Sequence, residues 1–172
     1  MQRLWTYLDD DGAETMGLTY AEVDAASADL AAALLGEYKL QVGDRALLVY
    51  PPSLHFVVAF MACLRAGVIA VPVYPPDPRK LQKDISAFAR AADDSGACLA
   101  LTSSLYDHAK KAADLKAKLA REGVKWPALQ WVVTTAGPYY GRMGGDAVRR
   151  DERYSGRTGG GAMPYQPHKC AA

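Results

Sequence analysis

Apolar residues follow two alternating patterns along the first 135 positions of the chain. Between short, continuous apolar runs lie longer stretches in which apolar residues recur every three or four positions, the spacing of one helical face. Two further short runs flank Asp11-Gly12, a dipeptide typical of a hairpin turn. The pattern therefore predicts a hairpin followed by four helix–strand pairs. The predicted strands are residues 45–50, 68–73, 97–102 and 129–134.

The predicted helices carry start and stop signals. Thr19 and Glu22 have capping-box spacing at the start of the first helix. Ser53 is placed to cap the second helix, which is apolar nearly all round, and Gly67 to end it. Ser104 and Asp107 open the fourth helix. The residues predicted to face inward are Val23, Ala26, Leu30 and Leu34 in the first helix, Leu81, Ile85, Phe88 and Ala92 in the third, and Leu105, Ala112, Leu115 and Leu119 in the fourth.

Alternation of helices and strands with short connections indicates an α/β fold, a mainly parallel sheet with helices on both faces. The continuous apolar run at 68–73 is typical of a strand covered on both faces. Pro72 cannot donate to a ladder, so it belongs at the end or edge of a strand. The stretch 54–74 does not predict a membrane span. Arg65 near its middle costs about 2.5–3.5 kcal/mol in a bilayer, and Gly67 and Pro72 interrupt it.

The composition changes after residue 136. Residues 137–172 hold eight of the 15 glycines and five arginines, with no Leu, Ile, Phe or Trp. Such a segment cannot bury enough apolar surface to offset the entropy lost on ordering. We therefore divide the chain into a folded region, 1–136, and a Gly/Arg-rich tail, 137–172, which we expect to be disordered.

Composition and charge narrow the function classes. The 172 residues fit one domain, and half of them are hydrophobic. A net charge of +1 gives no reason to expect nucleic acid as a partner. The three cysteines contain no C-x-x-C pair, so we expect no zinc site. The N-terminus is polar too early for a signal peptide, and we expect a cytoplasmic protein.

The sequence contains few residues in patterns typical of catalysis or ligand binding. The strand at 45–50 is followed by "PPSLHF", which lacks the glycines of a dinucleotide-binding turn. His55, His108 and His168 have no partners at catalytic spacing. Asp93-Asp94 is typical of a solvated helix end rather than a metal site. "YSGRTGGG" at 154–161 has the composition of an anion-binding nest but lacks the lysine, strand and helix of a phosphate loop.

Three segments nevertheless carry a resemblance. "LTYAEVDAASADLAAALL", "GDRALLVYPPSLHFVVAFMACLRAGVIAVPVYPPDP" and "LALTSS" resemble the N-terminal region of acyl-adenylate-forming enzymes, the AMP-dependent synthetases and ligases, over about residues 4–135. "YPP" at Tyr50 to Pro52 and "AVPVYPP" at Ala70 to Pro76 favour the fatty acyl-AMP ligase branch, which also supplies loading domains of polyketide synthases. The proline-rich exit would then be a rigid turn that aims the following helix.

The resemblance implies an activity for the full-length family. Its members join a fatty acid to AMP, using ATP and Mg²⁺, and pass the acyl group to the phosphopantetheine thiol of an acyl carrier protein. The family's Thr-Ser-Gly-rich loop, its later acidic residues and its mobile lysine all lie beyond the matching segment. We therefore assign no catalytic, cofactor-binding or metal-binding residue, and expect no ATP or Mg²⁺ site, in this chain.

We interpret the chain as an N-terminal fragment of a fatty acyl-AMP ligase-like enzyme, inactive alone, whose start is clipped and whose residues after about 136 are out of frame. Such a fragment exposes surface meant to be covered, and we expect it to self-associate. The alternative is a non-catalytic α/β remnant that acts as a binding module or as half of a split synthetase. An exposed apolar patch on the sheet would favour that alternative.

Overall fold

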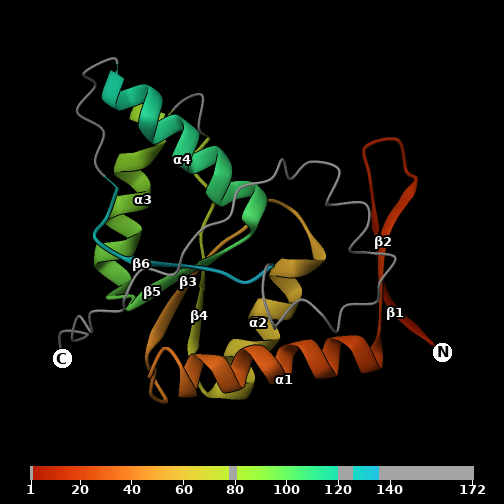
Figure 1. The fold of residues 1–172 in the computed structure, drawn as a ribbon. Helices are drawn as coiled ribbons and strands as arrows, with labels where there is room; N and C mark the ends of the chain where they lie inside the picture. The colour runs from red at the N-terminus through yellow and green to blue at the C-terminus, as the bar shows by residue number, and fades with distance from the viewer. Residues whose placement is uncertain (1, 78–80, 120–125, 136–172) are drawn as a thin grey trace.

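The computed structural model describes residues 2–77, 81–119 and 126–135, and the predicted tail lies outside them. Its elements follow the predicted order of a hairpin and four helix–strand pairs (Figure 1). They are β1 (Arg3–Leu8), β2 (Glu14–Thr19), α1 (Tyr20–Gly36), β3 (Arg45–Val49), α2 (Leu54–Ala66), β4 (Ile69–Pro72), α3 (Leu81–Ser95), β5 (Leu99–Thr102), α4 (Ser104–Leu119) and β6 (Gln130–Val133).

The sheet is parallel throughout its four described strands, in the order β4-β3-β5-β6. Leu47 on β3 pairs with Val71 on one side and with Ala100 on the other, and Ala100 pairs in turn with Trp131. The hairpin β1–β2 forms a separate antiparallel pair. Both arrangements were predicted from the apolar pattern, and both are confirmed.

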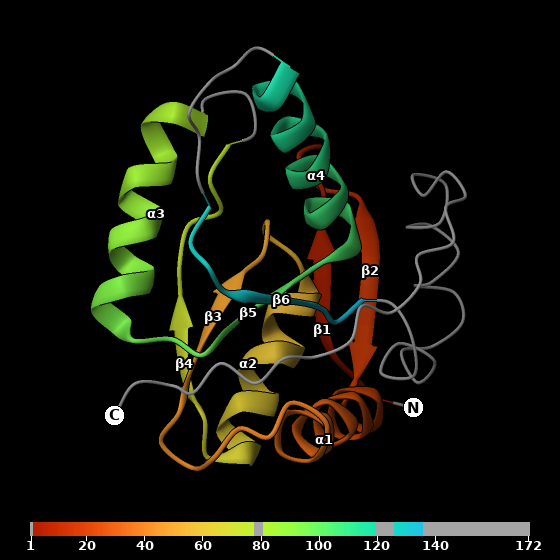
Figure 2. The same ribbon diagram turned by 60° about the vertical axis from the view of Figure 1, so that its left-hand side comes forward.

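Helices cover both faces of the sheet, α1 and α2 on one side and α3 and α4 on the other (Figure 2). Alternation along β3 explains this two-sided core, because successive side chains of a strand point to opposite faces. Ala46 and Leu48 pack with α1 and α2. Leu47 and Val49 pack with α3 and α4.

The edge strand β4 corrects one expectation. Its continuous apolar run predicted cover on both faces, yet Ile69 is 49% exposed and Ala70 and Val71 are only partly buried. The reason is position: β4 pairs only with β3 among the described strands, so its outer side lacks neighbours. Pro72 is the last residue of this edge strand, where its missing N–H costs least, as predicted.

The caps of the first two helices have largely the predicted form. Thr19 and Glu22 form a capping box, in which the Glu22 carboxylate accepts from the Thr19 N–H at 2.8 Å. Gly67 ends α2 with φ +69°, a conformation that favours glycine. Ser53 precedes α2, but its hydroxyl donates to the Pro51 carbonyl at 3.1 Å and does not cap the helix amides.

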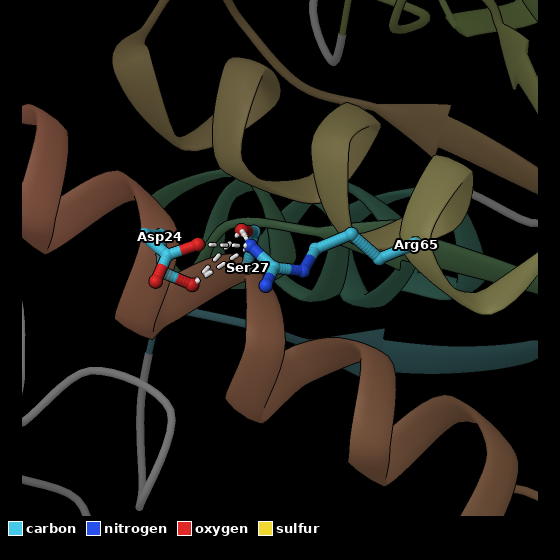
Figure 3. A network of polar contacts seen from close by, with 3 residues as sticks. All are labelled: Asp24, Ser27 and Arg65. Carbon is cyan, nitrogen blue, oxygen red and sulfur yellow. Dashed lines mark hydrogen bonds and ion pairs between the residues drawn. The ribbon is translucent and has the colours of Figure 1, made fainter.

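Arg65, which argued against a membrane span, joins the two helices on one face of the sheet. Its Nη1 donates to Asp24 Oδ1 at 2.6 Å and to Ser27 Oγ at 3.1 Å, so the guanidinium ties α2 to α1 (Figure 3). Both charged side chains are largely exposed, which limits the contribution of the pair to roughly 0–1 kcal/mol. In the described part of the chain, no helix is long and apolar enough to cross a membrane.

The face that α4 turns inward was predicted wrongly. Leu105, Leu115 and Leu119, expected in the core, are 48, 60 and 79% exposed. Ala112, the fourth residue expected there, is exposed as well. Tyr106 and Ala117 are buried instead.

An aromatic cluster determines the buried face of α4. The rings of Phe88, Tyr106, Trp126 and Trp131 contact one another at centroid distances of 5.6–6.5 Å. Lys110 Nζ lies over Trp126 and Trp131 at 4.9 and 4.6 Å from the ring centroids. Aromatic and cation–π contacts thus outweigh leucine burial here. Desolvation lowers the pKa of Lys110, and the nearby carboxylates of Asp107 and Asp114 partly offset this shift.

Candidate functional site

The order of the strands places a topological switch point between β3 and β5. The chain leaves β3 for β4 on one side and returns to add β5 on the other. In open α/β sheets, ligands bind outside the carboxyl ends of the strands at such a point. The segments there are residues 50–53 after β3 and residues 103–105 after β5.

A cavity of about 270 Å³ lies at this point, slightly below the range typical of small-molecule sites. The segments after β3 and β5 form one wall, and the hairpin β1–β2 contributes another. The lining residues are Tyr7, Thr15, Met16, Pro51, Pro52, Ser53, Leu54, His55, Ser103 and Leu105. The contribution of the hairpin was not predicted, because no local pattern says which part of the sheet a separate hairpin approaches.

A second hollow, of about 340 Å³, lies on the other side of the Pro51–Pro52 turn. Its walls include the proline-rich exit of β4, with Tyr74 at 85% exposure. Pro76 at the end of this exit is fully buried, and the Tyr106 hydroxyl donates to its carbonyl at 2.8 Å. The exit is therefore anchored on α4 as far as Pro76, whereas its predicted role in aiming the next helix depends on residues 78–80, outside the described ranges.

Hydroxyl groups hold the carboxyl ends of three strands together. The Tyr50 hydroxyl and Thr134 Oγ1 are 2.7 Å apart in the core, which links the end of β3 to the end of β6. Thr102 Oγ1 donates to the Val49 carbonyl at 2.7 Å. Thr135 Oγ1 accepts from the Ser104 N–H at 2.7 Å and donates to its hydroxyl at 3.0 Å. Sequence reasoning missed these bonds, since Tyr50 and Thr134 are 84 positions apart.

Burial keeps the ionisable groups behind this edge neutral. Desolvation raises the pKa of Tyr50 far above its ordinary value, although the hydrogen bond with Thr134 opposes the shift. Desolvation also raises the pKa of the Cys63 thiol to about 12. Neither group can serve as an anionic nucleophile near neutral pH.

The histidines and acidic residues take the places that the sequence suggested. His55 is buried at the start of α2, and His108 is exposed on α4, so the structure does not bring the two together. Asp93 and Asp94 are exposed near the end of α3. His168 and the "YSGRTGGG" segment lie outside the described residues. Within the described ranges, no three His, Cys, Asp or Glu side chains gather as a metal site would require.

The described lining residues of the cavity lack the charged groups that bind a nucleoside triphosphate. It presents hydroxyls from Tyr7, Thr15, Ser53 and Ser103 beside apolar groups, but no lysine or arginine among the described lining residues. Phosphate transfer needs cationic or metal groups against the developing charge. The described residues of this edge therefore do not supply those charges.

Comparison with known proteins identifies the family. The model of the AMP-binding enzyme family matches residues 5–152. The chain belongs to the AMP-binding enzymes. The resemblance seen in the sequence is thus confirmed, and the parallel sheet described above corresponds to part of the N-terminal domain of adenylate-forming enzymes.

Individual relatives include fatty acid ligases. The chain is 30% identical over 135 residues to the medium-chain-fatty-acid acyl-carrier-protein ligase JamA of Moorena producens, covering 77% of this chain and 21% of JamA. It is 32% identical over 99 residues to the human Disco-interacting protein 2 homolog A, covering 58% of this chain and 6% of that protein. The fatty acyl-adenylate ligase of Legionella pneumophila superposes with a TM-score of 0.63 at 29% identity, covering 82% of this chain and 22% of that one. The chain thus spans about a fifth of the ligases it matches.

Proposed function

We propose that this chain is the first part of the adenylate-forming domain of a fatty acyl-AMP ligase. The observation that carries the proposal is the match to the Legionella ligase, which runs through 82% of this chain at 29% identity. In the complete enzyme, a fatty acid would react with ATP to give an acyl-adenylate and pyrophosphate. The acyl group would then pass to the thiol of a carrier protein, in keeping with the name of JamA.

The role of the described residues in this reaction is to form a scaffold. The Pro51–Pro52 turn separates two hollows at the carboxyl edge, and the hydroxyl contacts from Tyr50 to Thr134 hold that edge in register. Bound ATP and Mg²⁺ would supply the phosphoryl chemistry, and the charged groups that hold them would come from outside the described residues. We therefore expect the chain alone to form no acyl-AMP. We place it in the cytoplasm and keep 1–136 as its folded region and 137–172 as its tail.

The test is a chimera. Residues 1–135 of this chain replace the corresponding segment of the Legionella fatty acyl-adenylate ligase, and pyrophosphate release is measured with ATP and a long-chain fatty acid. We expect the chimera to release pyrophosphate and the chain alone to stay at background. A chimera carrying Leu47→Asp is the control, because a charge buried in the sheet should abolish folding and activity together. A folded chimera without activity would refute the proposal.

The non-catalytic alternative has one observation in its favour. An exposed apolar row is present, although it lies on a helix and not on the sheet, where this alternative predicted it. It includes three leucines of α4, which suits a binding surface. Stoichiometric binding of a partner protein by a chain that fails in the chimera would support this alternative over the ligase scaffold.

A further inference from the structure

The outer face of α4 carries a row of exposed residues that no described element covers. It consists of Leu105, His108, Ala112, Leu115 and Leu119, which we name the α4 seam. The helix lies on the outside of the molecule in both views (Figures 1 and 2). The steps between these residues alternate between three and four, as at the a and d positions of a coiled coil. At 1.5 Å per residue, the seam is about 21 Å long.

The width of the seam favours a helix as the occupant over a lipid surface. Between the ends of the apolar row, lysines occupy three of the four flanking positions at e and g of the heptad, and Ala109 occupies the fourth. The lysines are Lys111, Lys116 and Lys118. A row confined to a and d is the narrow contact that one helix makes with another. A helix lying in a membrane interface has a wide apolar face with large hydrophobic or aromatic residues, whereas this row includes His108 and Ala112.

The positive charge beside the α4 seam favours a partner helix with acidic side chains. Lys111 and Lys118 each contact an aspartate on α4, at 2.6 and 2.9 Å, yet both remain about 70% exposed. The side chains of their partners are less exposed, at 8% for Asp107 and 31% for Asp114, so lysines dominate the outer surface. A second copy would set lysines against lysines in either orientation, whereas glutamates or aspartates on the partner would pair with them.

We propose that the α4 seam is the docking site for an acidic amphipathic helix of a partner protein, with apolar residues at a and d and carboxylates at e and g. The proposal rests on the placement of α4 and is independent of the proposed ligase function. Leu105 belongs both to the seam and to the lining of the 270 Å³ cavity, so a docked helix would end beside the carboxyl edge of the sheet.

A synthetic helix tests the docking chemistry. The probe is a fluorescent three-heptad peptide with Leu at a and d and Glu at e and g. The control peptide is identical except for Lys at e and g. Fluorescence anisotropy with the full 172-residue chain should give at least about tenfold tighter binding of the glutamate peptide at low salt. The difference should shrink at 1 M NaCl, where charges are screened within about 3 Å.

Variants locate the binding site. Leu115→Asp should abolish binding of the glutamate peptide, because it puts a like charge at the centre of the seam. Leu64→Asp is the matched control, since Leu64 is 57% exposed on α2, away from the seam, and its variant should bind like the parent chain. Reversing Lys111, Lys116 and Lys118 to Glu should transfer the preference to the lysine peptide. Circular dichroism establishes that each variant is folded.

Three results would overturn the proposal. One is equal affinity for the two peptides, or binding that survives Leu115→Asp. Another is binding to vesicles that contain about a third phosphatidylserine, if Leu115→Asp weakens it and the glutamate peptide does not bind. That result would assign the seam to a membrane surface. The last is a dimer in sedimentation that Leu115→Asp dissociates, which would make the occupant a second copy of this chain.

Discussion

Replacing Tyr50 by Phe isolates the hydroxyl contact that links the ends of β3 and β6. The ring keeps its edge-on contact with Phe56, at a centroid distance of 6.4 Å, so packing is preserved and only the bond to Thr134 is lost. A net intramolecular hydrogen bond contributes about 0.5–1.5 kcal/mol. Thr134 Oγ1 retains a long contact of 3.4 Å with the Thr102 carbonyl. We therefore expect Tyr50→Phe to lower the free energy of unfolding by about 1 kcal/mol.

The converse change should cost more. Thr134→Val leaves the Tyr50 hydroxyl buried without its described partner, and an unsatisfied buried group costs about 1–3 kcal/mol. Once Tyr50 is Phe, that penalty disappears, so the double variant should be less destabilised than the sum of the single ones, by about 1 kcal/mol. The contact thus predicts both an order of the single effects and a sign for their coupling.

Urea unfolding followed by circular dichroism measures these differences, and thermal unfolding should show a shift of about 2–4 °C per kcal/mol for a chain of this size. Tyr74→Phe is the control, since Tyr74 is 85% exposed and loss of its hydroxyl should change stability by less than about 0.5 kcal/mol. Strict additivity of Tyr50→Phe and Thr134→Val would refute the direct contact.

Three other perturbations give expected outcomes from local geometry. Gly67→Ala should lower the free energy of unfolding in urea by more than about 1 kcal/mol, because φ is +69° and a Cβ would lie 3.0 Å from a methyl carbon of Val42. In the control Gly36→Ala, the Cβ meets nothing within 4 Å, so stability should be unchanged or higher. Equal effects of the two substitutions would contradict this reasoning. Because burial raises the pKa of Cys63 to about 12, its thiol loses a proton in the unfolded chain at a lower pH than in the folded one. Stability should therefore fall as pH rises from about 9 toward 12, and Cys63→Ala should flatten that part of the pH–stability curve. An unchanged slope in the variant would count against this linkage. Thr19→Ala should lower stability by about 1 kcal/mol through loss of the capping box, and an unaltered melting temperature would argue against that cap.

Local patterns were sufficient for the elements and their order. Sequence spacing predicted the hairpin around Gly12, the capping box at Thr19 and the left-handed end of α2 at Gly67. Each depends on a few neighbouring residues whose conformational preferences act locally. The parallel sheet also followed from the alternation of elements, because short connections leave few other topologies.

The carboxyl edge could be only partly predicted. The Pro51–Pro52 turn and Ser53 are visible as a break after a strand, but the cavity beside them also needs Tyr7 from the hairpin and Leu105 from α4. These residues meet through packing between distant segments, for which a single sequence gives no signal. The resemblance of three sequence segments indicated the family, and the match of the AMP-binding enzyme model to residues 5–152 confirmed it.

The clearest division between sequence and structure lies in α4. The sequence by itself indicated a helix opened by Ser104 and Asp107, with leucines 105, 115 and 119 along one face. The structure turns a second row inward, which contains Tyr106, Lys110 and Ala117. Hydrophobicity favoured the leucine row for the core. Only the tertiary structure decided otherwise, because Phe88, Trp126 and Trp131 reach α4 from other parts of the chain and surround the second row. A helix turns inward the face that its neighbours can pack against, and those neighbours are fixed by the whole fold.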